Sequence, residues 1–163
     1  MGRVAVVQIP GVNCEYETAR ALEAVGLGAR IVRWNEPPSV WSEFDAYVLP
    51  GGFAFQDRIR AGAVAAKLGA VDRIAVEAER GKPVLGICNG AQILVEAGLV
   101  PGFHPGKVEL ALAPNRAPRR EGYLCRWAWV RAEEGPGRDC FATAARPGDV
   151  IPLESRVHWR ARC

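Results

Sequence analysis

Short apolar runs alternate with longer segments of helical periodicity over the first part of the chain. Four runs are almost continuously apolar, as strands covered on both faces of a parallel sheet are: 4–9, 29–34, 45–50 and 83–88. Apolar residues recur at helical spacing in segments that a glycine follows: 15–25, 59–80 and the segment from Asn89 to Gly98. The alternation predicts an α/β fold with three layers and a mostly parallel sheet.

After Pro101 the pattern changes, because prolines and arginines interrupt any helical period. Residues 124–132 alternate between apolar and polar positions, which predicts one strand, and residues 149–153 are expected to begin another. This part is therefore predicted to be a short antiparallel extension with loops. No linker separates it from the preceding part, and a single domain over residues 1–163 is the expectation.

Composition supports one globular domain and narrows the classes of function. Of the 163 residues, 49% are hydrophobic and 24% are charged, which is enough apolar material for a core. A net charge of +3, from 21 basic and 18 acidic residues, does not favour nucleic acid as a partner. No apolar stretch is long enough to cross a membrane, and the apolar opening ends at Pro10 and Gly11, as a first strand would rather than a signal peptide.

The five cysteines point away from metal and disulfide chemistry. They include no CxxC pair and no zinc spacing, and their odd number does not fit a disulfide framework. We therefore expect no metal site and a cytoplasmic, reducing location.

The segment GKPVLGICNGAQIL joins a predicted strand to a predicted helix through Cys88. This arrangement is a nucleophile elbow, in which Gly86 and Gly90 remove the Cβ atoms that would clash in so tight a bend. The helix N-terminus would favour the thiolate, and its N–H groups, including that of Asn89, could hold an oxyanion. The G-x-C-x-G frame favours a catalytic Cys88 over a cysteine that only packs.

Two further segments end at the same predicted edge of the sheet, where open α/β sheets bind ligands. Gly51 and Gly52 follow the strand at 45–50, so their N–H groups could complete an oxyanion hole opposite Cys88, although a plain turn uses the same residues. After the first strand, Asn13 is predicted to cap the helix that begins near Glu15. Cys14 lacks a strand-turn-helix frame and is predicted to be a loop or packed thiol.

In this order, the segments resemble the glutaminase subunits of phosphoribosylformylglycinamidine synthase, a family of class I glutamine amidotransferases of purine biosynthesis. The matching motifs lie between residue 3 and about residue 132: QIPGVNCE, PGGFAFQD, GKPVLGICNGAQILVEAGLVPG and YLCRWAWVRAEE. The resemblance implies a flavodoxin-like, class I glutamine amidotransferase-like fold.

The resemblance also implies an activity and roles for individual residues. Cys88 would attack the carboxamide of glutamine, form a glutamyl thioester and release ammonia, while the backbone at Gly52 and Asn89 stabilises the oxyanion. Gln92 would contact the glutamine substrate. The ammonia would pass to a large ATP-dependent synthase subunit, accompanied by a small third subunit, which aminates formylglycinamide ribonucleotide. ATP and Mg are expected only on the large subunit, so this chain would hold no cofactor.

The pattern departs from the family at the catalytic base. A cysteine amidohydrolase needs a base and an acid that orients it, and in this family both come from a C-terminal P-H-P-E motif. Neither His104 nor His158 is followed two residues later by glutamate. The final segment VIPLESRVHWRARC instead resembles a family segment upstream of the catalytic histidine. The chain is therefore expected to be C-terminally truncated relative to the family, with impaired glutaminase activity.

Other functions remain open. The chain could be a non-catalytic amidotransferase-like binding module, or a degenerate remnant. It could also be a cysteine-elbow protein of the stress-protein or intracellular-peptidase type, in which a histidine usually follows the elbow cysteine directly. Asn89 occupies that position here, which favours the amidotransferase.

Overall fold

The computed structural model describes residues 2–104, 106–111, 116–117, 120–121, 126–131, 146 and 148–155. They belong to two compact units, one within residues 1–111 and the other within residues 112–162. The division does not decide whether the two units fold together, so the single domain over 1–163 stays a prediction.

A four-stranded parallel sheet forms the centre of the first unit, in the order β2-β1-β3-β4. Its strands are β1 (Arg3–Gln8), β2 (Gly28–Arg33), β3 (Ala46–Leu49) and β4 (Val84–Gly86). Val6 of β1 lies opposite Ile31 of β2 and Val48 of β3. All four predicted strands are therefore confirmed. The inner strands β1 and β3 are the most buried, because neighbouring strands and helices cover them.

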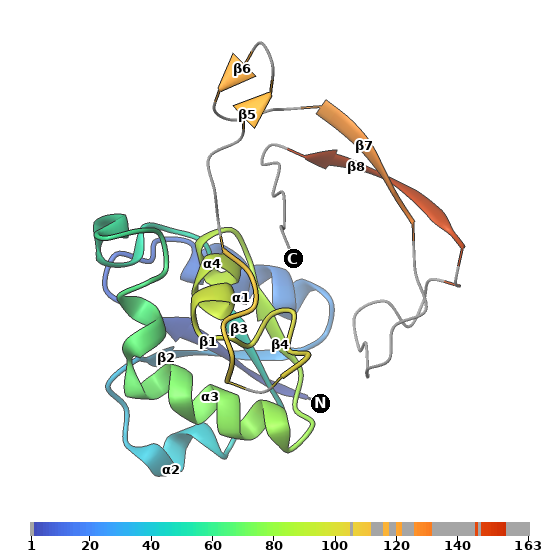
Figure 1. Ribbon diagram of the computed structural model, residues 1–163. Helices are drawn as coiled ribbons and strands as arrows, with labels where there is room; N and C mark the ends of the chain where they lie inside the picture. Colours follow the sequence, from blue (N-terminus) through green and yellow to red (C-terminus); the bar gives the residue numbers. More distant parts are fainter. Residues whose placement is uncertain are drawn as a thin grey trace. The chain divides into compact units, whose positions relative to one another are not determined.

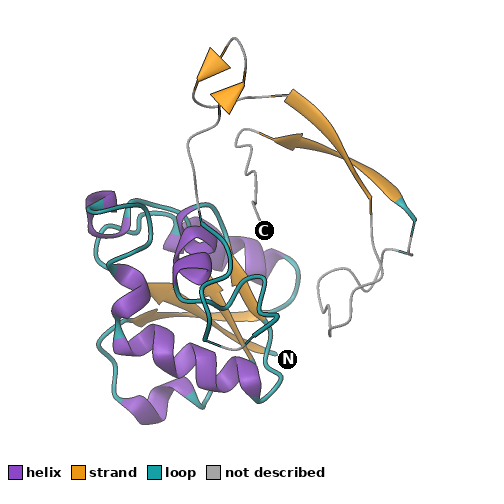
Figure 2. Cartoon of the chain, in the orientation of Figure 1, coloured by secondary structure: helices purple, strands orange, loops and turns teal. Residues whose placement is uncertain are grey.

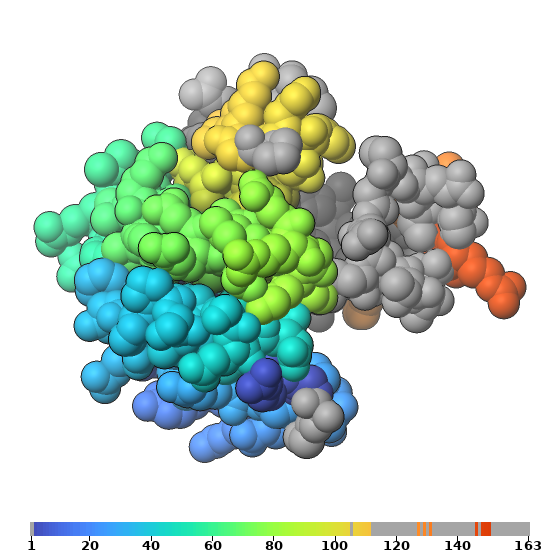
Figure 3. Space-filling view, turned by 90° about the horizontal axis from the view of Figure 1, so that it is seen from below, coloured from blue at the N-terminus to red at the C-terminus, as the bar shows by residue number. Residues whose placement is uncertain are grey.

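Helices cover both faces of this sheet, as the three-layer prediction requires (Figures 1 and 2). They are α1 (Glu15–Ala24), α2 (Pro38–Trp41), α3 (Gly69–Glu79) and α4 (Asn89–Glu96), with 3-10 turns η1 (Ala54–Asp57) and η2 (Ala65–Lys67). Helix α1 contacts β1 and β2, and Figure 1 shows the sheet between α1 and α3. The space-filling view looks onto α3, in green, with the α2 segment beside it (Figure 3).

The main core lies between the sheet and helices α2, α3 and α4. Alternate residues of the inner strands point to it, and the helices contribute apolar residues to the same cluster. Among its members are Val7, Trp41, Leu49, Ile74 and Ile93. This packing attaches α4 to β3 and so positions the residues at the start of α4.

The helix predicted over 59–80 is wrong in its first half. Only Gly69–Glu79 is α-helical, because Ile59 and Gly62 have φ of 72° and 81° and Leu68 is extended at φ −78° and ψ 139°. Ala65 is buried in turn η2, so apolar spacing continues through the break. Val25, the last residue of the helix predicted over 15–25, lies beyond the end of α1 and is 73% exposed.

Glu77 is a buried carboxylate on α3, with 4% of its surface exposed. Arg80 Nη1 lies 2.6 Å from its Oε1, and Lys82 Nζ lies 2.5 Å from its Oε2. The hydrogen bond from Lys82 lowers the pKa of Glu77 most; the charges of Lys82 and Arg80 act in the same direction, and burial opposes them. Burial, and then the charge of Glu77, raise the pKa of Tyr47 to about 12.

The lowered pKa of Glu77 predicts acid sensitivity. Because this pKa is lower in the folded than in the unfolded chain, Glu77 stabilises the fold above the ordinary glutamate value of about 4.3. That contribution is lost as the pH falls from there through the folded pKa. Glu77→Gln should flatten this part of the acid dependence, whereas Glu79→Gln, at an exposed position of the same helix, should preserve it. Urea unfolding between about pH 3 and pH 7 measures the effect, and parallel profiles of wild type and Glu77→Gln would contradict it.

The described part of the second unit consists of antiparallel strands and short loops (Figure 2). Strand β5 (Arg116–Ala117) pairs with β6 (Arg120–Glu121), and β7 (Arg126–Arg131) pairs with β8 (Val150–Ser155). The predicted antiparallel extension is therefore confirmed. His158, Cys125, Cys140 and Cys163 lie outside the described residues. Among the helices that are described, none has the length and apolar character needed to span a membrane.

Candidate functional site

Cys88 lies between β4 and α4 in the strained geometry of a nucleophile elbow. Its φ is 52° and its ψ is −110°, a combination that residues with a Cβ rarely adopt. It occupies the N-cap position of α4, and the residue is exposed. The turn therefore presents the thiol to solvent at the N-terminal end of a helix.

The two glycines around Cys88 allow α4 to lie directly against the sheet. A Cβ at position 90 would be 1.9 Å from the carbonyl oxygen of Leu49, and one at position 86 would be 2.7 Å from the backbone nitrogen of Ala91. Both contacts are shorter than any side chain permits. The folded backbone therefore has no room for a side chain at position 86 or 90, as the G-x-C-x-G frame predicted.

The loop after β3 brings Gly51 beside Cys88. A Cβ on Gly51 would lie 3.5 Å from Cys88 Cβ and also 3.5 Å from Cys14 Sγ. Gly52 pairs with Val12 in an isolated antiparallel bridge, where a Cβ would lie 2.7 Å from Val12 Cα. Three segments that are distant in sequence therefore meet at the carboxyl edge of the sheet, as expected from the order of the strands.

Two backbone N–H groups at this edge are available to a ligand. The bridge between Val12 and Gly52 uses the N–H groups of Asn13 and Phe53, which donate to Gly51 and Gly11. Among the hydrogen bonds of the described residues, none involves the N–H of Gly52 or Asn89. Asn89 begins α4, where the first N–H groups have no partner within the helix. These donors are suited to a developing oxyanion.

The side chain of Asn89 has contacts that the sequence did not reveal. It is 1% exposed, its Oδ1 accepts from Ala54 N at 2.9 Å, and its Nδ2 donates to Asp57 Oδ1 at 3.0 Å. The same Nδ2 donates to Gln92 Oε1 at 2.7 Å. Gln92 therefore contacts the residue that follows Cys88, and its carboxamide oxygen is already hydrogen-bonded within the protein.

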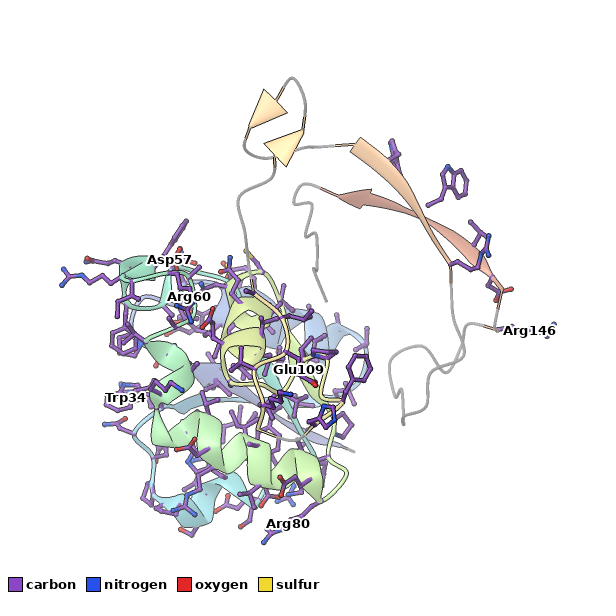
Figure 4. All side chains as sticks on the ribbon, viewed as in Figure 1. Trp34, Asp57, Arg60, Arg80, Glu109 and Arg146 are labelled. Atoms are coloured by element: carbon purple, nitrogen blue, oxygen red, sulfur yellow. The ribbon has the colours of Figure 1, made fainter. Side chains whose placement is uncertain are left out.

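An ion pair between an exposed arginine and a buried carboxylate attaches the same loop to the far part of α4. Arg60 Nε lies 2.5 Å from Glu96 Oε1, and Arg60 Nη2 donates to Glu96 Oε2 at 2.6 Å. Figure 4 shows Asp57 and Arg60 in neighbouring positions of the loop beside α4. Sequence reasoning missed both residues, because it placed 59–80 in a helix and no local pattern marks a contact between positions 36 residues apart.

Asn13 does not cap α1, so that prediction is wrong. The N-cap residue is Cys14, and no side chain makes the capping hydrogen bond. The N–H groups of Asn13 and Cys14 both donate to Gly51 O, at 3.4 and 3.2 Å, which places Asn13 before the helix. Glu15, the first residue of α1, is buried, and its Oε1 accepts from Gln8 Nε2 at 2.7 Å.

His104 is paired with a carboxylate, but in the segment at the other end of α4. Its Nδ1 lies 2.5 Å from Glu109 Oε1, and this hydrogen bond lowers the pKa of Glu109. The segment packs against the end of α4, since a Cβ on Gly98 would lie 2.8 Å from the backbone of Lys107. Cys88 caps the opposite end of that helix. Nothing here makes His104 a base for Cys88.

A hollow of about 340 Å³ lies between the loop that follows β3 and the residues that follow β1. Its lining residues come from that strand end and from the loop: Pro10, Gly11, Phe55, Gln56, Arg58 and Val64. Cys88 is not among them. The exposed thiol is therefore separate from this hollow.

Comparison with known proteins agrees with this geometry. The model of the CobB/CobQ-like glutamine amidotransferase domain family matches residues 1–153. The chain is 45% identical over 156 residues to the phosphoribosylformylglycinamidine synthase subunit PurQ of Methanothrix thermoacetophila, and 44% identical over 149 residues to that of Pyrobaculum aerophilum. It is also similar to the structure of PurLQS from Thermotoga maritima, with a TM-score of 0.74 and 33% identity.

The matches cover most of this chain but only part of its relatives. The two PurQ matches cover 93% and 91% of this chain, but 59% and 63% of the relatives. The structural match covers 96% of this chain and 68% of the other. The chain thus spans about three fifths of the length of these PurQ relatives, which confirms the expected difference in length. The chain belongs to the CobB/CobQ-like glutamine amidotransferase domain family, and its relatives include PurQ subunits of phosphoribosylformylglycinamidine synthase.

Proposed function

We propose that this chain provides the glutaminase site of a phosphoribosylformylglycinamidine synthase, with Cys88 as the nucleophile. The observation that carries the proposal is the exposed Cys88 in the elbow geometry with Gly51 beside it, together with the N–H groups of Gly52 and Asn89, which make no hydrogen bond among the described residues. Family membership supports the reaction class, which is amide hydrolysis through a thioester.

The proposed reaction proceeds in two halves. The Cys88 thiolate attacks the carboxamide carbon of glutamine, and the developing oxyanion accepts hydrogen bonds from the N–H groups of Gly52 and Asn89. The C–N bond then breaks, and the nitrogen leaves as ammonia after taking up a proton. Water hydrolyses the γ-glutamyl thioester to glutamate and restores the thiol. Gly51 leaves room beside Cys88 for the substrate, and Gln92, one turn into α4, would contact the glutamine, as the resemblance to the family implies.

The proton transfers need a general base, and none is assigned within these 163 residues. Neither histidine begins an H-x-E sequence, and the His104 segment packs at the other end of α4. We therefore propose that the glutaminase activity of this chain by itself is impaired. The same observation favours the second candidate function, a non-catalytic module that keeps the fold and binds a synthase subunit.

Assembly is proposed from the relatives. The structural relative is a PurLQS assembly, which supports a complex with a large synthase subunit and a small third subunit. In that complex, ammonia would aminate formylglycinamide ribonucleotide, and ATP and Mg would be bound by the large subunit. The chain itself would need no metal or cofactor for the step at Cys88. The free thiols of Cys14 and Cys88 fit a cytoplasmic location.

Covalent labelling with an electrophilic glutamine analogue, 6-diazo-5-oxo-L-norleucine, tests the proposal. Peptide mass spectrometry is expected to find the label on Cys88, and excess glutamine should suppress it because both compete for one site. Cys88→Ser should abolish the label. Cys14→Ser, which removes the other thiol beside Gly51, should preserve it.

Failure of glutamine to protect, or labelling of Cys14 instead, would overturn the proposed site. Ammonia release from glutamine is measured in parallel on the chain alone. Labelling without turnover is expected from an impaired enzyme, whereas turnover that is lost in Cys88→Ser would show that the impairment is wrong. Binding of the large subunit without any labelling would favour the non-catalytic module.

A further inference from the structure

The loop that carries Gly52 has a backbone conformation that its own residues disfavour. Phe55, Gln56 and Asp57 have φ of 52°, 58° and 52°, and Ile59 has φ of 72°. A left-handed conformation brings Cβ close to the backbone, so residues other than glycine adopt it mainly where their surroundings impose it. Contacts from outside the loop must therefore hold it.

Asn89 supplies contacts at both ends of turn η1. Its Oδ1 accepts from Ala54 N, and its Nδ2 donates to Asp57 Oδ1. A backbone N–H can only donate, so the amide orientation of Asn89 follows from its bond to Ala54. Because the side chain is 1% exposed, water cannot easily replace either partner. One buried carboxamide therefore holds both ends of the disfavoured segment, while the bond from Phe55 N to Pro10 O holds its middle.

The outer part of the loop is attached to α4 independently. Arg60 makes a two-point contact with the buried carboxylate of Glu96. The backbone of Gly62 lies so close to that of α4 that a Cβ on Gly62 would be 2.7 Å from Ile93 N. A change at Asn89 should therefore loosen residues 54–57 without releasing 60–62.

We infer that the Asn89 side chain is a positioning residue that holds the loop after β3 in register with the elbow, so that the Gly52 and Asn89 N–H groups converge beside Cys88. This inference rests on the proposed function for the roles of these two donors. It adds that the residue directly after the nucleophile has two separate tasks. Its backbone offers one oxyanion donor, and its side chain sets the position of the other. The Asn89 side chain acts on the loop through its hydrogen bond to Asp57.

A charge-conserving double-mutant cycle tests this role. Asn89→Asp alone places a carboxylate against Asp57, where the native bond is 3.0 Å long, and should repel the loop. In the Asp57→Asn/Asn89→Asp double variant, the carboxylate at position 89 can accept from Ala54 N and from the new carboxamide at position 57. The pair keeps its total charge and exchanges donor and acceptor. Recovery in the double variant cannot come from the charge near Cys88, because position 89 stays a carboxylate.

Two probes of Cys88 separate positioning from thiol reactivity. Iodoacetamide requires only an accessible thiolate, whereas the glutamine analogue 6-diazo-5-oxo-L-norleucine also requires the substrate pocket. Asn89→Asp is expected to lower the ratio of analogue to iodoacetamide labelling by about tenfold or more, since losing an oxyanion-hole donor costs about 10²–10³ in rate. The double variant should return to within about threefold of wild type. Hydrogen exchange should rise at residues 54–57 in Asn89→Asp and return in the double variant.

The outcomes distinguish this role from the proposed function. Equal labelling ratios in wild type and Asn89→Asp would overturn the positioning role, as would a double variant no better than the single one. If Asn89→Asp does not fold, Asp57→Ala takes its place, because it keeps the Asn89 bond to Ala54; it should lower the ratio and raise exchange at 54–57, and no change would overturn the role. A wild-type chain that reacts with iodoacetamide but not with the analogue would overturn the proposed function, and this role with it.

Discussion

Gly90→Ala is expected to lower the free energy of unfolding by about 3 kcal/mol or more, since overpacking costs about 1–3 kcal/mol even where side chains can adjust. A Cβ at position 90 would lie 1.9 Å from the carbonyl oxygen of Leu49 and 2.6 Å from its carbonyl carbon. Both atoms belong to the backbone of β3, an inner strand of the sheet. Relief therefore requires α4 to move away from β3, and Cys88 would move with it. Urea unfolding followed by circular dichroism measures the loss.

Gly69→Ala is the matched control for this change. Gly69 begins α3, and no heavy atom lies within 4 Å of the position that a Cβ would take. Alanine favours a helix over glycine by about 1 kcal/mol, so this variant should be as stable as wild type or more stable. If Gly90→Ala unfolds at the same urea concentration as wild type, the close approach of α4 to β3 is not a feature of the folded chain.

Gly52→Ala is expected to lower the free energy of unfolding by about 2 kcal/mol or more, because overpacking and a disfavoured backbone conformation each cost about 1–3 kcal/mol. The φ of Gly52 is 151°, and a Cβ there would lie 2.7 Å from Val12 Cα and 2.8 Å from Asn13 N. The bridge between the loops after β1 and β3 would have to open. If Gly52 has the proposed oxyanion role, its N–H would then be displaced, so labelling by the glutamine analogue should also fall.

Gly51→Ala, one residue earlier, should separate stability from function. A Cβ at position 51 would meet Cys14 Sγ and Cys88 Cβ at 3.5 Å, which is ordinary contact. The free energy of unfolding should stay within about 1 kcal/mol of wild type. The added methyl group would fill the space beside Cys88, so analogue labelling should fall while iodoacetamide labelling persists. A stable Gly52→Ala variant with normal analogue labelling would contradict the proposed oxyanion role of that loop.

The close contacts that these glycine variants test were in part predictable from local patterns in the sequence. The G-x-C-x-G spacing predicted a close contact around Cys88, and Gly86 and Gly90 make that contact. The four apolar runs predicted the parallel strands, because a strand covered on both faces has no polar side to interrupt the run. The carboxyl edge of the sheet then predicted that the segments holding Cys88 and Gly51 would meet.

The predictions that were wrong concern where helices begin, and in one of them the apolar spacing has two explanations. Residues 59–68 have helical spacing, but they form a turn with Gly62 at φ 81°, and Ala65 is buried without an α-helix. Spacing reports which residues are buried, and a compact turn against a core can bury the same residues as a helix. Asn13 was one residue too early to cap α1, because the position of a helix start depends on the bond from Cys14 N to Gly51.

By itself, the sequence determined the sheet, the elbow at Cys88 and the two glycines opposite it, because these depend on local patterns of burial, chirality and close approach. Only the tertiary structure decided what holds the site together. Asn89 reaches Asp57 across 32 positions, and Arg60 reaches Glu96 across 36. Such contacts leave no periodic trace in a single sequence, because each needs only one compatible side chain at a place that the folded backbone chooses. The elbow at Cys88 could thus be predicted from the sequence, and the contacts that hold the loop beside it could not.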